Sequence, residues 1–353
     1  MHIKIFSKIY KKIIFFFFFR LYGRILTTQN KLNKNLFTKK KSYNGNNYKF
    51  FEIKDGRLYT NTSDVAYISN NIIISGPSIQ LRENFNKNVN QNITVKNGTP
   101  KFYKKINFRV FSLLCGVDAN NNYYHWFFDS ISKYFIFKKF YKFTNNDFFL
   151  TPNLKYNYQI QSLKMLNIKN AINSYNLKHF KVKKLISLNF KHININHPDW
   201  IVKEMRSSFI PKKYSNKQSL KIFINRGGIS SDARDISNKE ELIFFLKNQN
   251  FLIIDPSKYS FKDEIKLFNS AKIVVGIYGA ALTNVIFCQK KTHIIELKNN
   301  KTDALYKNIT NKSSLYYHSL ISAKINSNSS RRAFDGSIHV DMSKLSKILS
   351  KIN

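Results

Sequence analysis

The sharpest hydrophobic pattern lies in the last third of the chain, where short apolar runs alternate with amphipathic stretches. The stretches 240–247 and 261–269 have helical spacing, and Ser237 (in a capping box with Glu240) and Ser260 are suited to cap them. The apolar runs are typical of strands buried on both faces of a parallel sheet, and they are 220–225, 251–254, 272–276 and 293–297. With a third helix expected from Gly279, this order predicts a Rossmann-like domain with right-handed crossovers.

The first half of the chain shows a weaker pattern of the same kind. Residues 65–68, 72–74 and 108–114 have the β-rich composition of strands. Residues 123–140 are aromatic and free of helix breakers, over a length that suits a helix. Further alternating strands and helices are expected over 145–200, so the sequence predicts an α/β domain in this half as well.

Changes in composition divide the chain into four parts. A basic, aromatic segment comes first, followed by an α/β domain, the Rossmann-like domain and a tail or helix that could pack back on the first domain. The expected limits are 1–45, 46–205, 206–320 and 321–353.

Length and composition limit the class of protein. At about 100–200 residues per domain, a chain of 353 residues suggests two domains. Hydrophobic residues make up 43% and charged residues 22%, which excludes a globally disordered or collagen-like chain. The two cysteines exclude a disulfide framework and a cysteine-based zinc module.

The net charge is unusually high, because 59 Lys and Arg stand against 20 Asp and Glu, giving +39. Such a surface could bind nucleic acid or an anionic membrane. It could also follow from a composition rich in Lys, Asn, Ile, Phe and Tyr along the whole chain. The basic residues are diffuse and form no nucleic-acid-binding module, so we expect no specific nucleic-acid partner. Anionic substrates such as nucleotides and sugar phosphates would still be attracted.

The most apolar run is Ile13–Phe19, which has 7 residues. Crossing a bilayer takes about 20, so no transmembrane span is expected. Lys11, Lys12 and Arg20 flank the run, which suggests an interfacial membrane anchor; a helix packed on the core is the alternative. We therefore expect a cytoplasmic protein that could be peripheral at the inner face of the membrane.

Three strand ends of the predicted parallel sheet carry distinctive chemistry, and ligands bind at this edge of such sheets. Asn225 and Arg226 follow the first strand, and Arg234 lies in the same loop. Two guanidinium groups suit a diphosphate, which accepts bidentate hydrogen bonds. The alternative is a pair of solvated loop arginines.

The second strand end is rich in small residues, and the third carries an acid. In the segment Gly276-Ile-Tyr278-Gly279-Ala280-Ala281-Leu282, the backbone could approach a phosphate at a helix N-terminus. The spacing is not that of a dinucleotide fingerprint, and a tight turn without a ligand is the alternative. Glu296 could accept hydrogen bonds from ribose hydroxyls or could be a surface glutamate.

In the first half, His125 and Asp129 stand four residues apart in Tyr124-His-Trp-Phe-Phe-Asp129 and would share one face of a helix. A carboxylate fixes the tautomer of an imidazole and prepares it as a general base. The neighbouring aromatic side chains could form a wall for a sugar ring. A helical ion pair beside a buried aromatic cluster is the alternative.

Taken together, these segments resemble glycosyltransferase family 61. Tyr124-His-Trp-Phe-Phe-Asp129 is similar to the family's Tyr/Trp-His-Trp-x-x-Asp segment, and the strand ending at Asn225-Arg226 is similar to its Ser-Arg or Asn-Arg end. Arg234, Asp255-Pro256 and 271–276 follow in the expected order. Gly279-Ala-Ala-Leu-Thr283-Asn284 resembles the family's Gly-Ala-Gly-Leu-Thr-Asn. The resemblance covers about 125 to 300.

The resemblance implies an α/β, GT-B-like fold, with two Rossmann-like domains facing across a cleft. A nucleotide-sugar donor, usually a UDP-sugar, would bind the second domain, and a glycan or lipid-linked glycan acceptor the first. The sugar would pass to a hydroxyl with inversion, in a role such as capsular polysaccharide biosynthesis. By position, Arg226, Arg234 and the backbone at 279–282 would hold the diphosphate, and His125 or Asp129 would face the cleft.

The chain departs from the family pattern at three positions. Tyr278 replaces a common His, Ala281 a Gly and Ile277 a Pro. A phenol can hydrogen-bond a phosphate but is not cationic near neutral pH. No Asp-x-Asp motif is evident, so transfer without a metal or other cofactor is expected. The alternatives are an inactive family member and a non-enzymatic basic protein that binds nucleic acid or membranes.

Overall fold

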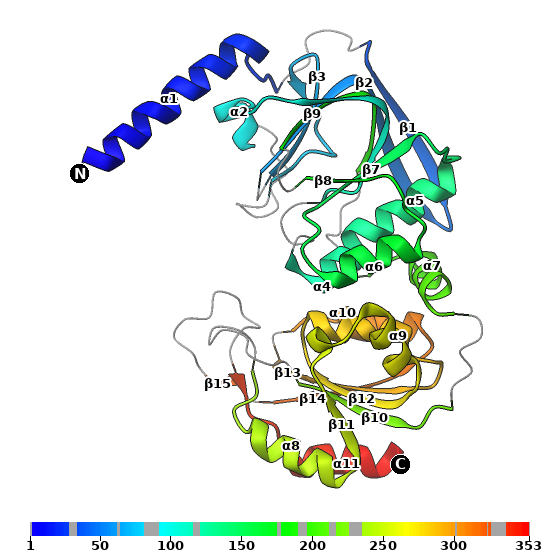
Figure 1. Cartoon of the computed structure of the whole chain (residues 1–353). Helices are drawn as coiled ribbons and strands as arrows, with labels where there is room; N and C mark the ends of the chain where they lie inside the picture. The colour runs from blue at the N-terminus through cyan, green and yellow to red at the C-terminus, as the bar shows by residue number, and fades with distance from the viewer. Residues whose placement is uncertain are drawn as a thin grey trace. The chain divides into compact units, whose positions relative to one another are not determined.

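In the computed structural model, the described residues are 2–27, 34–61, 64–80, 92–115, 121–174, 178–189, 196–211, 217–225, 235–300, 302–322, 324–325 and 337–352. The chain divides into two compact units. The first comprises Met1–Lys155 and Ile168–Lys191, and the second comprises Tyr156–Asn167 and His192–Asn353. Each unit has its own sheet, which confirms the α/β class with two separate sheets that the family resemblance implied. Figure 1 shows the elements of both units.

The first unit is built on a mixed sheet, which has nine strands within the described residues, in the order β4-β3-β2-β9-β6-β7-β8, with β1 on β2 and β5 on β3. Its strands β6–β9 pair in parallel, whereas β2 pairs antiparallel with β9 and β3. The strands are β1 (Leu36–Tyr43), β2 (Asn46–Thr60), β3 (Asp64–Ser69), β4 (Ile72–Ile73), β5 (Ile79–Gln80), β6 (Lys104–Ser112), β7 (Asp147–Thr151), β8 (Ala171–Asn173) and β9 (His179–Asn189). The antiparallel half is the difference from a Rossmann-like sheet, in which all strands are parallel.

The helix predicted over 123–140 is one continuous run of three parts. It begins as α4 (Tyr123–His125), continues as the π-helix η2 (Trp126–Ile131) and ends as α5 (Ser132–Phe140). The ring of Phe137 in α5 packs on that of Phe111 in β6, with centroids 5.1 Å apart. Within the described residues, the other helices of this unit are α1 (His2–Tyr22) and α2 (Ile93–Asn97). None of the helices in the described part of the chain has the length and apolar character needed to cross a bilayer.

The second unit contains the predicted parallel sheet, extended by one further strand, β14, which the sequence did not indicate; the order is β11-β10-β12-β13-β14. The strands are β10 (Leu220–Ile224), β11 (Phe251–Ile254), β12 (Ala271–Ile277), β13 (His293–Lys298) and β14 (Tyr316–Ile321). The helices are α6 (Asn157–Met165), α7 (Asp199–Phe209), α8 (Lys239–Asn248), η3 (Pro256–Lys258), α9 (Phe261–Asn269), η4 (Ala280–Phe287), α10 (Leu305–Lys312) and α11 (Met342–Ile352). A short pair, β15 (Lys324–Ile325) and β16 (Ser337–Ile338), completes the unit.

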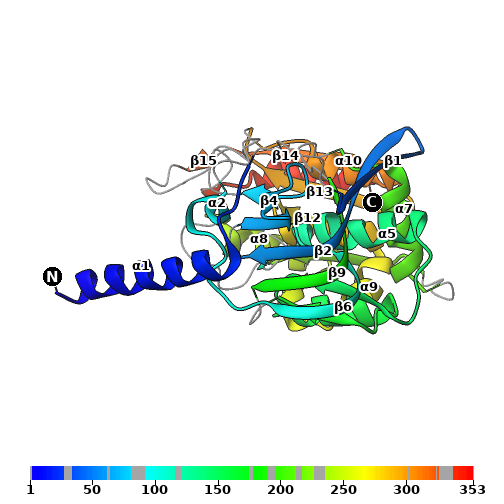
Figure 2. The same cartoon turned by 90° about the horizontal axis from the view of Figure 1, so that it is seen from above.

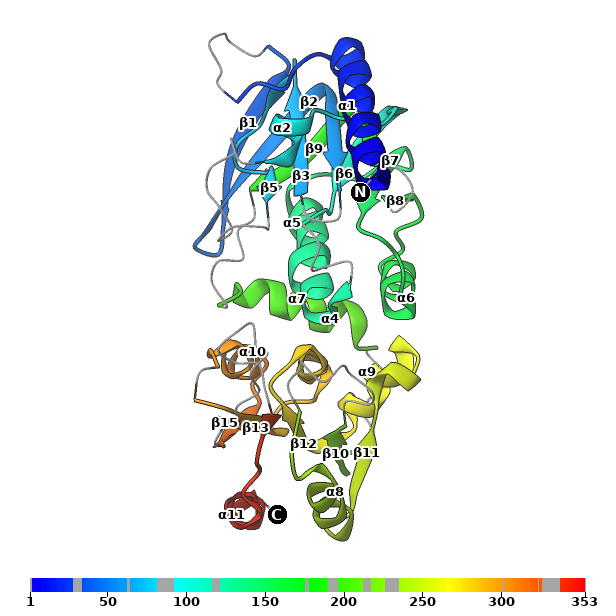
Figure 3. The ribbon, with the colours of Figure 1, turned by 90° about the vertical axis from the view of Figure 1, so that its left-hand side faces the viewer.

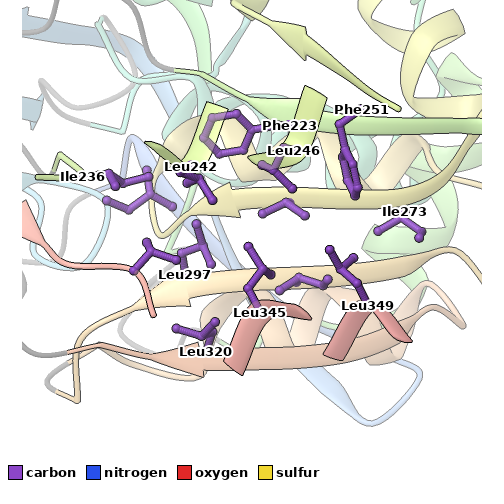
Figure 4. Close-up of a cluster of buried hydrophobic side chains, with 14 of the residues drawn as sticks. Phe223, Ile236, Leu242, Leu246, Phe251, Ile273, Leu297, Leu320, Leu345 and Leu349 are labelled. Atoms are coloured by element: carbon purple, nitrogen blue, oxygen red, sulfur yellow. The ribbon is translucent and has the colours of Figure 1, made fainter. Parts of the chain in front are cut away.

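Helices cover both faces of this sheet. Figures 1 and 3 show α8 and α11 on one face and α9 and α10 on the other. Leu242 and Leu246 of α8 join Leu345 and Leu349 of α11 in one buried cluster on the sheet (Figure 4). From the sequence, we expected a tail or helix over 321–353 that could pack back on the first domain. The tail helix instead packs on the sheet of its own unit, because its leucine stripe matches this apolar face.

The division between the units also differs from the predicted limit between 205 and 206. Helices α6 and α7 both belong to the second unit. The side chain of Gln161 in α6 accepts a hydrogen bond from the backbone nitrogen of Phe261 at 2.8 Å. The ring of Phe209 in α7 contacts those of Phe261 and Phe287. These contacts tie both helices to the face of the parallel sheet that α9 and η4 cover.

Candidate functional site

The carboxyl ends of β10, β12 and β13 lie at one edge of the parallel sheet. The register aligns Ile224 with Gly276, and Gly276 with Glu296. Residues that follow these positions therefore meet at the edge where open parallel sheets bind ligands. This is the edge on which the sequence placed the donor site.

Asn225 is the described residue at the end of β10. Its backbone nitrogen donates to the carbonyl of Ile254 at 2.8 Å. Its side-chain oxygen Oδ1 is buried and has no hydrogen-bond partner among the described residues. A buried acceptor of this kind costs free energy unless something donates to it, so this atom could take a ligand hydrogen bond. Arg226 and Arg234, the predicted diphosphate contacts, lie outside the described residues.

Gly276 has a packing role that the sequence did not reveal. A Cβ at this position would lie 3.0 Å from Cδ2 of Leu282 and 3.3 Å from Cδ1 of Ile224. The missing side chain therefore lets η4 pack closely on the sheet. Leu282, Thr283 and Asn284 are buried in the same layer, so their side chains also serve packing. A role of these four residues in binding stays a prediction.

The turn after β12 holds Tyr278 in a buried position. Its backbone nitrogen donates to Leu297 at 2.8 Å, and its ring contacts that of Tyr306 in α10, with centroids 5.4 Å apart. Gly279 is buried, whereas Ala280 and Ala281 at the start of η4 are half-buried. The helix expected after Gly279 is therefore present as a 3-10 helix, and the expected backbone contact with a phosphate would fall at its first residues.

Glu296 requires a correction. The sequence placed it at the end of a strand, within reach of ribose hydroxyls, but β13 continues to Lys298 and Glu296 is fully buried. Its Oε2 accepts a hydrogen bond from the hydroxyl of Tyr317 and lies 3.6 Å from Nζ of Lys298. Burial raises the pKa of the Glu296 carboxyl, and the contacts with Tyr317 and Lys298 oppose this shift. The carboxylate is thus part of an internal polar cluster.

His125 and Asp129 form the pair that their spacing predicts. Nδ1 of His125 lies 2.7 Å from Oδ2 of Asp129. The side chain of Asn122 caps α4 by accepting from the backbone nitrogen of His125 at 3.3 Å. His125 is half-buried, and the side chain of Asp129 is 11% exposed, so solvent screens the pair weakly. The contact holds the imidazole in one orientation, with Nε2 as the ring atom that would accept a proton.

The aromatic side chains next to this pair divide into two groups. Trp126, Phe127 and Phe128 are fully buried in η2, so they cannot form the wall for a sugar ring that the sequence suggested. Tyr124 is half-buried, and its ring lies 5.1 Å from that of His125. Of the aromatic side chains expected to form that wall, the partly exposed one in contact with His125 is therefore Tyr124 of α4.

A buried lysine near the pair was not predicted from the sequence. Lys133 follows Asp129 by four residues, is 2% exposed and donates from Nζ to the carbonyl of Leu114. Burial lowers the pKa of the Lys133 ammonium, while Cys115 and Asp129 oppose this shift. The recurrence of polar residues at 125, 129 and 133 was the signal available in the sequence. Among the residues that the structure describes, no group of three His, Cys, Asp or Glu could hold a metal ion.

Comparison with known proteins gives one family match that covers both the His125–Asp129 pair and most of the parallel sheet. Residues 123–295 match the model of the family described as Glycosyltransferase 61. The match begins at α4, includes the His125–Asp129 pair and ends within β13. No curated protein matches the sequence. Because the matched family consists of glycosyltransferases, the match argues against the alternative of a non-enzymatic binding protein. The chain belongs to the glycosyltransferase 61 family and is an enzyme that acts on a sugar donor and an acceptor.

Proposed function

We propose that this enzyme transfers a sugar from a UDP-sugar to a hydroxyl of a glycan acceptor, with inversion at the anomeric carbon. Family membership supports sugar transfer. The observation that carries the mechanism is the 2.7 Å contact between His125 and Asp129, because inverting transfer needs a base for the acceptor proton.

The base in this mechanism is the His125 imidazole. As the acceptor oxygen bonds to the anomeric carbon, its proton passes to Nε2 of His125. The Nδ1–H of the resulting imidazolium donates to the Asp129 carboxylate, which stabilises the new positive charge. The bond between the anomeric carbon and the diphosphate oxygen breaks on the opposite face of the sugar, and its electron pair leaves with UDP.

The donor is proposed to bind at the carboxyl edge of the parallel sheet in the second unit. Arg226 and Arg234 would pair with the diphosphate, and the backbone at the start of η4 would donate to it. The buried Oδ1 of Asn225 supports a hydrogen bond at the same edge. Charged donors of this kind stabilise a leaving diphosphate, so we propose transfer without a metal ion.

The biological setting is proposed as surface polysaccharide assembly, such as capsule synthesis, at the inner face of the cytoplasmic membrane. The acceptor would then be a glycan or a lipid-linked glycan. Support comes from the basic net charge of +39 and from the exposed apolar side chains of α1. Both features suit an enzyme that works beside anionic lipid.

A panel of nucleotide sugars tests this function. The purified protein is screened by thermal shift against UDP-, GDP-, CMP- and dTDP-sugars, and release of nucleotide is then followed with candidate acceptors. We expect stabilisation by a UDP-sugar and full turnover after exhaustive EDTA treatment. Stabilisation by a different nucleotide class would overturn the donor assignment, and strict dependence on Mn²⁺ or Mg²⁺ would overturn metal-independent transfer.

A further inference from the structure

Helix α1 presents an apolar stripe to solvent. Five of its large apolar side chains, at the spacing of one helical face, are about half exposed or more; they are Ile9, Ile13, Phe16, Phe17 and Leu21. Ile13 is 62% exposed and Phe16 is 64% exposed. We call this set the outward stripe. Such a row is unusual on a helix in water, because the burial of apolar side chains is what normally stabilises a surface helix.

The opposite side of α1 is fixed to the first unit. Phe18 is buried, and its ring lies 5.1 Å from that of Phe102. The ring of Tyr22 contacts that of His179 in β9, and the guanidinium of Arg57 in β2 lies 5.5 Å from its centroid. The C-terminal half of α1 therefore packs on the first unit. This agrees with the alternative of a helix packed on the core for that half of the helix. Figure 2 shows the rest of the helix extending away from the sheet.

Positive charge surrounds the outward stripe. No Asp or Glu precedes Glu52 in the sequence, whereas Lys and Arg recur from Lys4 onward. Lys11 and Lys12 are exposed on α1. Arg20 lies within the stripe, with its guanidinium carbon 5.6 Å from the centroid of the Phe16 ring. Long basic side chains can cover apolar surface with their stems while their charges reach polar headgroups.

We propose that the outward stripe, together with Phe102, binds the surface of an anionic lipid bilayer, with α1 lying in the interface. A bilayer surface accepts apolar side chains and pairs with cations in the same contact. An RNA or DNA backbone would satisfy the charges but would leave the aliphatic side chains Ile9, Ile13 and Leu21 without a partner. Phe102 extends the apolar surface beyond the helix, because it is 68% exposed and packs on Phe17. This inference does not depend on sugar transfer.

Co-sedimentation of the full chain with vesicles tests the proposal. Phosphatidylcholine vesicles with and without about 30% phosphatidylglycerol are compared, for the wild type and for the double variant Phe16→Ser/Phe17→Ser. The matched control is Phe244→Ser on α8, because Phe244 is 69% exposed and lies outside the proposed surface. We expect the double variant to lower the partition coefficient on anionic vesicles at least about tenfold, and the control to leave it unchanged.

A charge series tests the electrostatic part of the same contact. The variant Lys11→Gln/Lys12→Gln/Arg20→Gln is compared with Lys247→Gln/Lys258→Gln/Lys262→Gln, whose lysines are exposed on the second unit. The first set is expected to weaken binding to anionic vesicles at least about tenfold, and the second much less. Circular dichroism and thermal unfolding verify that all variants are folded. Similar losses in both sets would indicate a diffuse charge effect and would overturn the proposal.

A depth measurement separates insertion from adsorption. Tryptophan at position 16 (Phe16→Trp) should be quenched by lipids brominated on their acyl chains, and Phe244→Trp should not. Each of three results would overturn the proposal: no binding of the wild type, unchanged binding of the Phe16/Phe17 variant, or absence of quenching at position 16. Sedimentation velocity without lipid identifies a competing occupant. If the wild type is an oligomer that the same double variant converts to a monomer, a second copy covers the stripe instead.

Discussion

Asp129→Asn tests the proposed base most locally, because it removes a charge and little volume. The carboxylate contacts Nδ1 of His125 at 2.7 Å and is 11% exposed, so its hydrogen bond to a charged imidazole is weakly screened. Hydrogen bonds to charged groups contribute about 1.5–3 kcal/mol. The imidazole becomes charged only as it takes the acceptor proton, so this stabilisation applies to the transition state. At about 1.4 kcal/mol per factor of ten, kcat should fall about 10- to 150-fold.

The assay is an initial-rate measurement with saturating donor, after identical folded fractions have been verified by near-UV circular dichroism. Asp147→Asn is the matched control. Asp147 is also a buried carboxylate of the first unit, and it pairs with Arg109, with Oδ1 2.6 Å from Nε. It should lose stability and keep kcat. A kcat of Asp129→Asn within twofold of wild type, or an equal loss in Asp147→Asn, would refute the role assigned to the pair.

Two further predictions concern stability. Burial lowers the pKa of His179 from 6.5 to about 4, so the neutral imidazole stabilises the fold above pH 6.5 and this stability is lost as the pH falls towards 4. Between pH 7.5 and 5 the wild type should lose about 2 kcal/mol more unfolding free energy than His179→Gln, measured with urea; parallel pH curves would contradict this. Leu349 is 2% exposed, so Leu349→Ala should destabilise the second unit by about 2–5 kcal/mol in thermal or urea unfolding. Lys351→Ala, which is exposed on the same helix, should change little, and equal effects would contradict the packing of α11 on the sheet.

The sequence predicted the second unit well, because both faces of its sheet are buried. Strands of that kind are apolar at nearly every position, and this pattern can be recognised without knowing which strands are neighbours. The N-cap of α9 could also be predicted, because it involves residues close in sequence. Oγ of Ser260 accepts a hydrogen bond from the backbone nitrogen of Asp263 at 3.2 Å. The cap of α8 was misplaced, since the helix starts after Asn238 and the Ser237 hydroxyl contacts Ile338 instead.

The features that the sequence could not predict depend on contacts between residues that are distant in the sequence. Glu296 is buried in β13, and the hydroxyl of Tyr317 on the next strand offsets part of the cost by donating to it. The strand β2 was missed because charged residues interrupt its pattern. Its Glu52 is held by Lys39 and Lys184 from the two neighbouring strands, at 2.8 and 2.9 Å. Such cross-strand contacts follow from register, which local composition does not encode.

The His125–Asp129 pair could be predicted, whereas its surroundings could not. A spacing of four residues brings two side chains together on a helix whatever the rest of the fold does. Burial of the adjacent Trp126–Phe128 run depends on how η2 packs, and so does the position of Lys133. The pair was therefore visible in the sequence, whereas the burial of three of the aromatic side chains expected to form a wall was not.

Donor binding and proton removal are proposed to use residues of different units, and calorimetry with UDP tests this division most directly. UDP is titrated into the wild type, Arg226→Ala and His125→Ala, each in metal-free buffer. We predict that Arg226→Ala weakens UDP binding at least about tenfold, as expected for loss of a charge-assisted bidentate contact, while His125→Ala binds UDP like the wild type. Unchanged UDP affinity in Arg226→Ala, or loss of UDP binding in His125→Ala, would contradict this division of roles.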